Sequence, residues 1–546
     1  MRKTHSGRLL VLLLASCQGT GTQQQLPTYY DIGAVHHTVT TSSPEAQLWF
    51  DRGLGLTYGF NHEEAIVCFD KAAALDPGCA MAWWGKANAL GPNYNNPEMT
   101  PEACKIAFES SQKALAASAG CTQLEKDLIR AQTRRYPSSE AAPRPPLDAA
   151  YAEAMRGVQK AHPDDADVAA LCAESLMQLN PWKLWSPEGV AAEGTPEIRT
   201  LLEDSLARWP DHPALCHLYI HTMEAGPKVR MAAPVADRLQ GLTPGLGHLV
   251  HMPSHIYIWT GRYRDAVRLN QQAVEVDKAF VAHAGKDNFY TLYRLHNYHF
   301  IAYGAMWSGQ RAVAMKAARE MIGEVPPGLL TGMIDFLDIF MATPMHVMVR
   351  FGMWDEILAE PEPAEQLLAA RAVWHYTRGL AYASLDRVPE AEKEQALFVQ
   401  AKAAVPASRL LFNNPVKDIL AVADAFLEGE IEYRKGNYDQ AFASLRKAVS
   451  LDEKMNYDEP WGWMEPARHA LGALLTEQGR YEEAYAVYEA NLGRYPDNGW
   501  ALHGLAECLE QLGRKKEAEE ARARFSKAWV DADVEIPGSC YCRIGK

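Results

Sequence analysis

Basic residues are scarce in this chain of 546 residues: 54 lysines and arginines stand against 68 aspartates and glutamates, for a net charge of −14. Non-specific nucleic-acid binding needs a basic face, so this balance argues against a nucleic-acid partner. Common catalytic motifs are also missing. The sequence has no GxxxxGK[ST] phosphate loop, no HExxH, no GxSxG and no CxxCH. These absences argue against P-loop nucleotide hydrolysis, zincin-type proteolysis, nucleophile-elbow chemistry and c-type haem attachment.

Long hydrophobic runs are few as well. The apolar stretch Met333–Val349 is interrupted by two aspartates, and the run Leu9–Leu14 is too short to span a bilayer. Three basic residues precede that short run, and Leu14-Ala15-Ser16-Cys17 follows it. This arrangement resembles the lipobox of bacterial lipoproteins, which implies cleavage before Cys17, a lipid on Cys17 and Gln18–Gln25 as a tether. The alternative is an ordinary cleaved signal peptide.

The resemblance implies an exported protein of the bacterial cell envelope, anchored by lipid only and facing the periplasm or the exterior. Export permits disulfides, but the ten cysteines leave an odd nine once Cys17 is set aside, and no CxxC pair occurs. Cys540 and Cys542 lie close together near the C-terminus, where we expect a frayed end. We assign no disulfide and expect most other cysteines to be buried small residues.

Small and bulky residues recur at fixed spacings. At repeat positions 4, 8, 11, 20, 24, 27 and 32 the chain has Trp49, Gly53, Leu56, Ala65, Phe69, Ala72 and Pro77. Similar units begin around Gly379, Gly429, Gly472 and Ala506. The pattern resembles the tetratricopeptide repeat, a 34-residue helix–turn–helix unit. The resemblance implies an all-α solenoid, a superhelix of helical hairpins with a concave groove.

Some spacings exceed 34 residues; Ala441 and Ala484, for example, are 43 apart, which predicts insertions between repeats. We divide the chain into a signal and tether (1–25), N-terminal repeats (26–160), central histidine-rich repeats (161–355), C-terminal repeats (356–530) and a tail (531–546).

Half of the 18 histidines fall within residues 212–299, and they follow the repeat. When the prolines at 210 and 244 are taken as position 32, four successive repeats carry polar residues at positions 2, 5, 9 and 12. In chain order these are His217, His221 and Glu224; His248, His251 and His255; His296, His299 and Tyr303; and His346. The tetratricopeptide resemblance implies that these positions line the groove. Residues four apart on a helix lie one above the other.

Neutral imidazole is the commonest metal ligand near pH 7, and neighbouring first helices pack about 8–10 Å apart. We therefore predict a metal site in the groove. His217, His221, His251 and His255 are the expected primary ligands. Glu224, His248, His296, His299 and His346 are expected as further ligands or as residues that support the ligands. The alternative is a groove of hydrogen-bonding histidines that recognises a peptide or an anion.

Three other side chains are candidates for catalysis. Glu224 or Glu174, the latter near position 9 of its repeat, could act as a general base, and Tyr303 could orient substrate or donate a proton. Pro253 and Pro344 each fall at position 7, two residues before a histidine. They lie either inside a helix, at a cost of about 3 kcal/mol, or in the first turn of a helix that starts later.

These patterns lead to three functional hypotheses. The first is a metal-dependent enzyme that uses zinc, copper or iron on a small-molecule or peptide substrate in the groove, as a hydrolase or as an oxygenase or oxidase. The second is a scaffold that binds a protein or peptide, for which the terminal repeats are also suited. The third is metal storage or delivery. The segments His217–Glu224 and His296–His299 loosely resemble the tetratricopeptide repeat protein 38 group, which implies a shared site but no particular reaction.

Overall fold

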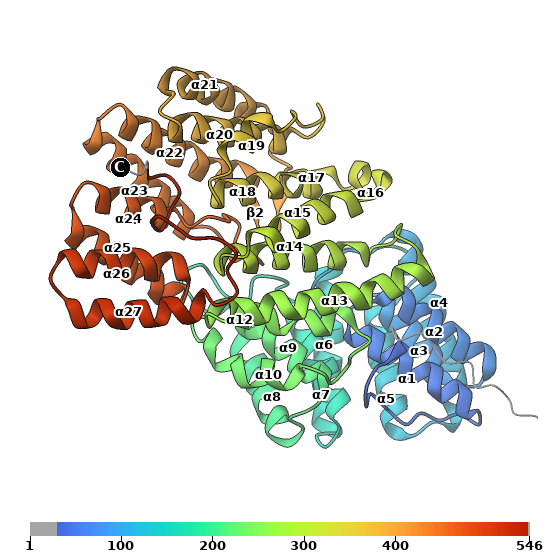
Figure 1. The fold of residues 1–546 in the computed structure, drawn as a ribbon. Helices are drawn as coiled ribbons and strands as arrows, with labels where there is room; N and C mark the ends of the chain where they lie inside the picture. The colour runs from blue at the N-terminus through green and yellow to red at the C-terminus, as the bar shows by residue number, and fades with distance from the viewer. Residues whose placement is uncertain (1–29, 544–546) are drawn as a thin grey trace, which may run out of the picture.

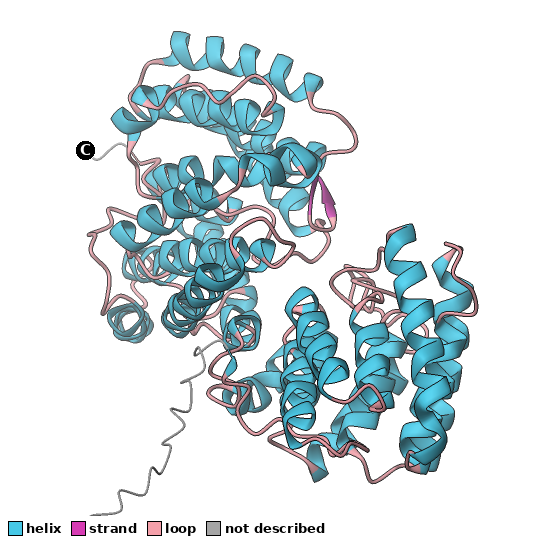
Figure 2. Ribbon diagram, turned by 90° about the vertical axis from the view of Figure 1, so that its right-hand side faces the viewer, coloured by secondary structure: helices cyan, strands magenta, loops and turns pink. Residues whose placement is uncertain are grey.

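The described chain is almost wholly helical. The computed structural model describes residues 30–543. Figure 2 shows helices nearly everywhere, and the described residues form a single short pair of strands. Most helices pack on their neighbours in sequence, as expected of stacked helical hairpins. Figure 1 shows the array curling round, from blue N-terminal helices through green and yellow central ones to red C-terminal helices that lie beside the green ones. The all-α solenoid predicted from the sequence is confirmed.

The N-terminal repeats are held by aromatic side chains packed against glycines. The helices are α1 (Pro44–Tyr58), α2 (His62–Leu75), α3 (Ala80–Ala89), α4 (Pro101–Ala117), the 3₁₀ turn η2 (Ser118–Gly120), α5 (Gln123–Arg135) and α6 (Arg144–Ala161). Phe69 of α2 lies between α1 and α3. A Cβ on Gly53 or Gly85 would lie 2.7 or 2.4 Å from its ring. Glycine at these positions therefore sets how closely the helices approach.

The central repeats contain the shortest helices. They comprise α7 (Ala166–Met177), α8 (Thr195–Arg208), α9 (Pro213–Met223), η3 (Val229–Ala232), α10 (Ala233–Leu239), α11 (Gly247–His251), α12 (Pro253–Trp259), α13 (Tyr263–Ala284), α14 (Thr291–Trp307), α15 (Arg311–Glu324), α16 (Pro327–Gly332), α17 (Ile334–Leu337), η4 (Ile339–Ala342), α18 (Thr343–Arg350) and α19 (Trp354–Ala359). Pro253 and Pro344 lie in the first turns of α12 and α18. Of the two readings of these prolines, the first-turn placement is therefore confirmed.

The C-terminal repeats have longer, more regular helices. They comprise α20 (Leu368–Ser384), α21 (Val388–Ala404), β1 (Leu410–Leu411), β2 (Asn414–Pro415), α22 (Val416–Arg434), α23 (Tyr438–Glu453), α24 (Ala467–Glu477), α25 (Tyr481–Arg494), α26 (Gly499–Gln511) and α27 (Lys515–Ala528). The two strands pair antiparallel around a turn at Phe412 and Asn413. The expected boundary between residues 355 and 356 falls inside α19, so the array continues across it.

The expected open groove is filled in its central part. The insertion between α23 and α24 enters the interior, where Trp463 and Glu459 are buried. The C-terminal repeats also pack back on the central ones: the indole Nε1 of Trp500 donates to the carbonyl oxygen of Met306 at 2.8 Å. Residues predicted to face an exposed groove are therefore enclosed, and His251 is fully buried.

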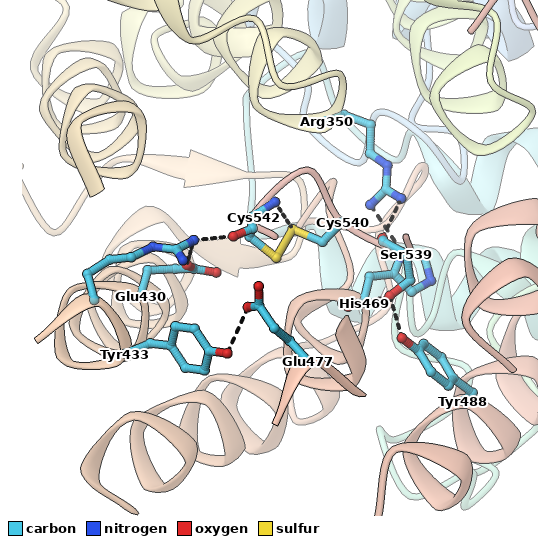
Figure 3. The surroundings of a disulfide bond; sticks show 10 residues. Arg350, Glu430, Tyr433, His469, Glu477, Tyr488, Ser539, Cys540 and Cys542 are labelled. Atoms are coloured by element: carbon cyan, nitrogen blue, oxygen red, sulfur yellow. Dashed lines mark hydrogen bonds and ion pairs between the residues drawn. A yellow bond between two sulfur atoms is a disulfide. The ribbon is translucent and has the colours of Figure 1, made fainter. Parts of the chain in front are cut away.

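The C-terminal tail is ordered against the repeats, so the expectation of a frayed end is wrong. Ser539 is fully buried; its hydroxyl donates to the carbonyl oxygen of His469 and lies 2.7 Å from the Tyr488 hydroxyl. Arg350 donates to the Ser539 carbonyl oxygen. Figure 3 shows these contacts beside the disulfide between Cys540 and Cys542. Hydrogen bonds to several helices tie the tail down, which sequence position alone does not reveal.

The N-terminal signal, tether and Cys17 lie outside the described residues. None of the helices between residues 30 and 543 is long and apolar enough to cross a membrane.

The packing against Phe69 predicts a stability difference between two Gly→Ala changes. Gly85→Ala places a Cβ 2.4 Å from the Phe69 ring, and we expect this overpacking to cost about 1–3 kcal/mol and lower Tm. Gly157→Ala is the control. It lies within α6 with nothing near its Cβ position, and should be stabilising by up to about 1 kcal/mol. Thermal denaturation followed by circular dichroism measures both; equal Tm values would contradict the packing account.

Candidate metal centre

Six histidines from three successive repeats gather in two groups of three. In each group the ring nitrogens that could bind a metal lie within 4.8 Å of one another. We name them triad A (His217, His221 and His248) and triad B (His251, His255 and His296). Each triad takes positions 5 and 9 of one repeat and position 2 of the next. Triad B therefore reproduces triad A one repeat further along the array.

The helices of the repeats place these rings. His217 and His221 lie one turn apart on α9, so both project from one face. His248 and His251 lie on α11, and His255 follows on α12, beyond the short break at Pro253. α14 supplies His296 from the next repeat.

Hydrogen bonds to groups outside the triads hold the Nδ1 atoms of two rings. Nδ1 of His217 lies 2.8 Å from the carbonyl oxygen of Tyr58. A carbonyl only accepts, so Nδ1 carries the proton and Nε2 keeps its lone pair. Nδ1 of His251 lies 2.6 Å from Oδ1 of Asn270, whose amide nitrogen donates to Ser254 and to the Ala266 carbonyl oxygen. His251 therefore also presents an unprotonated Nε2.

A single carboxylate connects the two triads. Glu224 lies 2.8 Å from Nδ1 of His221 through Oε1 and 2.6 Å from Nδ1 of His255 through Oε2. Even a protonated carboxyl has one proton for two rings, so at least one ring donates to it. We expected Glu224 as a general base, a further ligand or a residue that supports the ligands. Because both of its oxygens contact ring nitrogens, its position suits orienting the histidines better than taking a proton from substrate.

The Nε2 atoms of neighbouring rings face one another within each triad. Nε2 of His217 is 3.1 Å from Nε2 of His248, and Nε2 of His251 is 2.6 Å from Nε2 of His255. Nε2 of His221 has no hydrogen-bond partner among residues 30–543. Lone pairs at such distances repel unless a proton or a cation lies between them. The arrangement therefore suits a bound cation in each triad.

Burial keeps five of the six rings neutral. Burial lowers the pKa of His217 to about 3, and it lowers the pKa values of His221, His248, His251 and His296 well below their usual range. Neighbouring imidazoles lower them further. Neutral rings retain the lone pairs that metals require.

The pKa of the nearby Glu224 carboxyl group shifts in the opposite direction, upward. Burial, and then the adjacent Glu459, raise the pKa of Glu224 well above its usual range. Positive charge between the rings would favour its ionised form.

Two phenylalanines cover the triads. The ring of Phe60 stacks on His221 and His248 with centroids 5.9 and 5.4 Å away. Phe300 stacks on His255 at 5.1 Å with the planes 2° apart. Apolar faces at these positions restrict water and lower the local dielectric, which strengthens any ion–ligand interaction.

Sequence reasoning missed Glu459. Its Oε2 lies 2.9 Å from Nδ1 of His255 and 4.0 Å from Nε2 of His296. It comes from the insertion between α23 and α24, some 200 residues away in sequence. The enlarged spacing between Ala441 and Ala484 is the only signal for it in the sequence. That spacing predicts an insertion but not where the insertion goes.

Two predicted ligands lie outside the triads. His299 packs edge-on against Phe340 at 5.1 Å, and burial lowers its pKa to about 3. His346 lies 3.1 Å from the carboxylate of Glu465. The repeat that carries His299 has tyrosine at position 9, and position 2 of the following repeat is Ile339. The three-histidine pattern ends there.

Two residues expected to take part in catalysis also lie apart from the triads. Tyr303 is buried, packed 5.6 Å from Trp307, because the C-terminal repeats cover this part of α14. Glu174 lines a separate small cavity with His62 and Arg135. Burial raises its pKa to about 7, partly offset by Arg135. Neither residue belongs to a triad.

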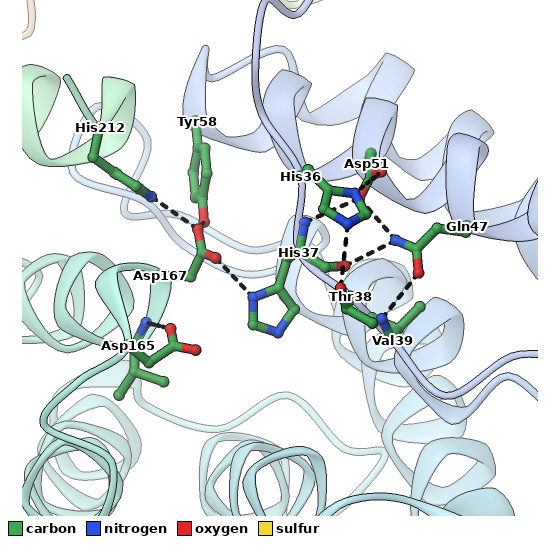
Figure 4. A network of polar contacts seen from close by, with 11 residues as sticks. His36, His37, Thr38, Val39, Gln47, Asp51, Tyr58, Asp165, Asp167 and His212 are labelled. Carbon is green, nitrogen blue, oxygen red and sulfur yellow. Dashed lines mark hydrogen bonds and ion pairs between the residues drawn. The ribbon is translucent and has the colours of Figure 1, made fainter. Parts of the chain in front are cut away.

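A polar network around Asp167 joins the segment 36–39 to Tyr58 and His212 (Figure 4). Nδ1 of His37 lies 2.7 Å and Nε2 of His212 3.0 Å from the carboxylate of Asp167, which also accepts from the Tyr58 hydroxyl. Tyr58 holds His217 through its backbone carbonyl. This network therefore fixes the residue that orients one ring of triad A. With Asp165, His37 and Asp167 could also hold a cation.

A cavity of about 330 Å³ adjoins the triads. His248, His255, His296 and Glu459 form part of its wall, and most of the remaining wall is apolar. The candidate metal centre is therefore next to space for a small molecule.

Comparison with known proteins identifies the repeats. Residues 426–455 and 475–524 each match models of the tetratricopeptide repeat. No curated protein matches the chain significantly. Neither repeat match reaches the central region, so its resemblance to the tetratricopeptide repeat protein 38 group stays a prediction.

Several solved structures are similar along much of their length. Human IFIT1 as a dimer with m7Gppp-AAAA is 13% identical over 89% of this chain and 91% of its own, with a TM-score of 0.31. The Rap protein complexed with competence and sporulation factor is 11% identical over 67% and 98%, with a TM-score of 0.30. The Cut9–Hcn1 tetramer of the APC/C is 12% identical over 88% and 76%, with a TM-score of 0.31.

Similarities this low carry no information about the site. Tetratricopeptide repeats form helical scaffolds, which commonly bind peptide or protein partners. The two repeat matches cover the C-terminal units that the glycine and alanine spacing predicts. The chain therefore contains tetratricopeptide repeats within residues 426–455 and 475–524.

Proposed function

We propose that triads A and B each hold a divalent transition-metal ion and that this pair is the active centre of a metal-dependent enzyme. One observation carries the proposal: acceptors outside the triads hold Nδ1 of His217 and His251, and the Nε2 atoms of both rings turn toward neighbouring rings. Proteins orient histidine ligands in this way.

The chemistry of the donors supports the same assignment. Imidazole suits zinc, copper and iron, and three imidazoles per ion leave a position for water or substrate. Two buried glutamates, Glu224 and Glu459, stand beside the rings. Buried carboxylates need positive charge, which two cations would supply.

The enzyme role has more support than storage because the rings border a cavity. Glu459 lines that cavity, and its Oε1 has no hydrogen-bond partner in the described part of the chain. Glu459 is therefore better placed than Glu224 or Glu174 to take a proton from a bound molecule or water. A bound metal would supply Lewis acidity for hydrolysis, or redox chemistry with oxygen if it is copper or iron. Scaffold binding through the terminal repeats is compatible with this role.

We also propose that the chain is exported and carries a lipid on Cys17, on the strength of the lipobox resemblance. We expect Cys17→Ser to move the protein from the membrane to the soluble fraction after cell fractionation. Wild-type protein found wholly in the soluble fraction would contradict the anchor.

Metal content tests the two-site arrangement. Elemental analysis by plasma mass spectrometry should give about two ions per chain in the wild type, one for each triad. His221→Ala and His251→Ala should each retain about one ion, and the double variant none, since each change removes one of three ligands. His346→Ala is the matched control because His346 is buried but outside the triads; it should keep both ions. Full occupancy in the double variant would overturn the proposal.

The contact between Asn270 and His251 makes a separate prediction. Asn270→Ala removes the acceptor for Nδ1 of His251, and we expect metal affinity at triad B to fall roughly 10–100-fold. Asn270→Asp keeps an acceptor at this position and should retain most of the affinity. Titration with a competing chelator measures both variants. Equal loss in the two would point to general damage to the fold rather than to orientation of the ring.

A further inference from the structure

The cavity beside the triads has a strongly apolar wall. Most of its apolar side chains come from α14, α15, the broken segment between α15 and α18, and the strand turn, among them Leu292, Ile322, Phe336 and Phe412. Several of them, such as Leu292, Ile322 and Phe336, are only half-buried because they face open space. Apolar surface left open in this way favours an apolar occupant.

Charge in the wall is confined to the metal centre. Among the described residues that line the cavity, Glu459 is the only carboxylate and no lysine or arginine occurs. Away from triad B, a phosphate, sulfate or carboxylate group would find no basic partner in the wall, and burial of an unpaired anion is costly. Asn95, Asn96 and Asn413 offer neutral hydrogen bonds. The wall therefore fits an uncharged ligand.

Size excludes a long peptide. A volume of about 330 Å³ lies near the lower end of the range of small-molecule sites, about 300–1,000 Å³. Three methionines in the wall, Met321, Met333 and Met341, adapt to ligands of different shape. A larger cleft of about 1190 Å³ shares Trp182, Phe412 and Asn413 with the cavity. It lies next to the cavity and is a candidate route of entry.

We propose that the substrate is an uncharged small molecule with a hydrocarbon chain or ring, which occupies this cavity and presents its reacting group to triad B. The triad contributes His255 and His296 to the cavity wall, beside Glu459. This inference rests on the proposed function for the reaction, but the cavity can be tested without any metal.

Binding of a homologous series of n-alcohols tests the proposal. 1-Butanol to 1-decanol are titrated by calorimetry into the metal-loaded and the chelator-treated protein. We expect affinity to rise roughly fourfold per added methylene until the cavity is full, because each methylene leaves water for an apolar wall. No binding by any alcohol, or affinity that does not depend on chain length, would overturn the proposal.

Three variants locate the binding. Ile322→Trp fills the cavity and should abolish chain-length dependence. Phe336→Ala enlarges it and should shift the best chain length upward, so the test survives if the first variant fails to fold. Val399→Trp, at an exposed position on α21, is the control and should bind as the wild type does. Unchanged binding in both cavity variants would contradict the assignment.

The measurements separate this inference from the proposed function. Alcohol binding by a protein that takes up no metal would refute the metal centre and leave the apolar cavity standing. Metal in both triads without alcohol binding would refute the substrate class alone.

Discussion

The carboxylate of Glu224 is the contact on which the geometry of the site depends. It lies 2.8 Å from Nδ1 of His221 on α9 and 2.6 Å from Nδ1 of His255 on α12. It therefore fixes the position of one ring of triad A relative to one ring of triad B. The carboxylate is buried and costly to place there, which the nitrogens around it must offset. Glu459 adds a second buried carboxylate from the C-terminal repeats. The site thus joins distant parts of the chain.

Burial gives the imidazoles their chemical character. Burial, and then neighbouring imidazoles, lower the pKa values of His221 and His251 well below their usual range. Neutral rings with inward lone pairs are an unfavourable arrangement unless a cation is bound. The regular repeat builds both triads in the same way. Positions 5 and 9 of one repeat and position 2 of the following repeat supply three ring nitrogens, and the same positions one repeat later supply three more. The neighbouring apolar cavity leaves space for a small molecule beside the triads.

Much of this was predictable. The spacing of Gly53, Phe69 and their counterparts predicts the helical hairpins, and the ladder from His217 to His296 predicts that these histidines share one face. The sequence does not show how the array closes. Glu459 reaches triad B through an insertion whose path depends on packing of Trp463 and its neighbours, which no local pattern encodes. For the same reason Tyr303 was misplaced: the C-terminal repeats cover it. His299 occupies position 5 of its repeat, but position 9 of that repeat is Tyr303 and position 2 of the following repeat is Ile339. Repeat position alone therefore predicts more metal ligands than the structure brings together.

The most direct test of the account is anomalous diffraction from crystals of the metal-loaded protein. The account predicts two separate peaks, one within reach of Nε2 of His217, His221 and His248 and one within reach of His251, His255 and His296. Absence of both peaks, or ions bound only elsewhere in the chain, would contradict it.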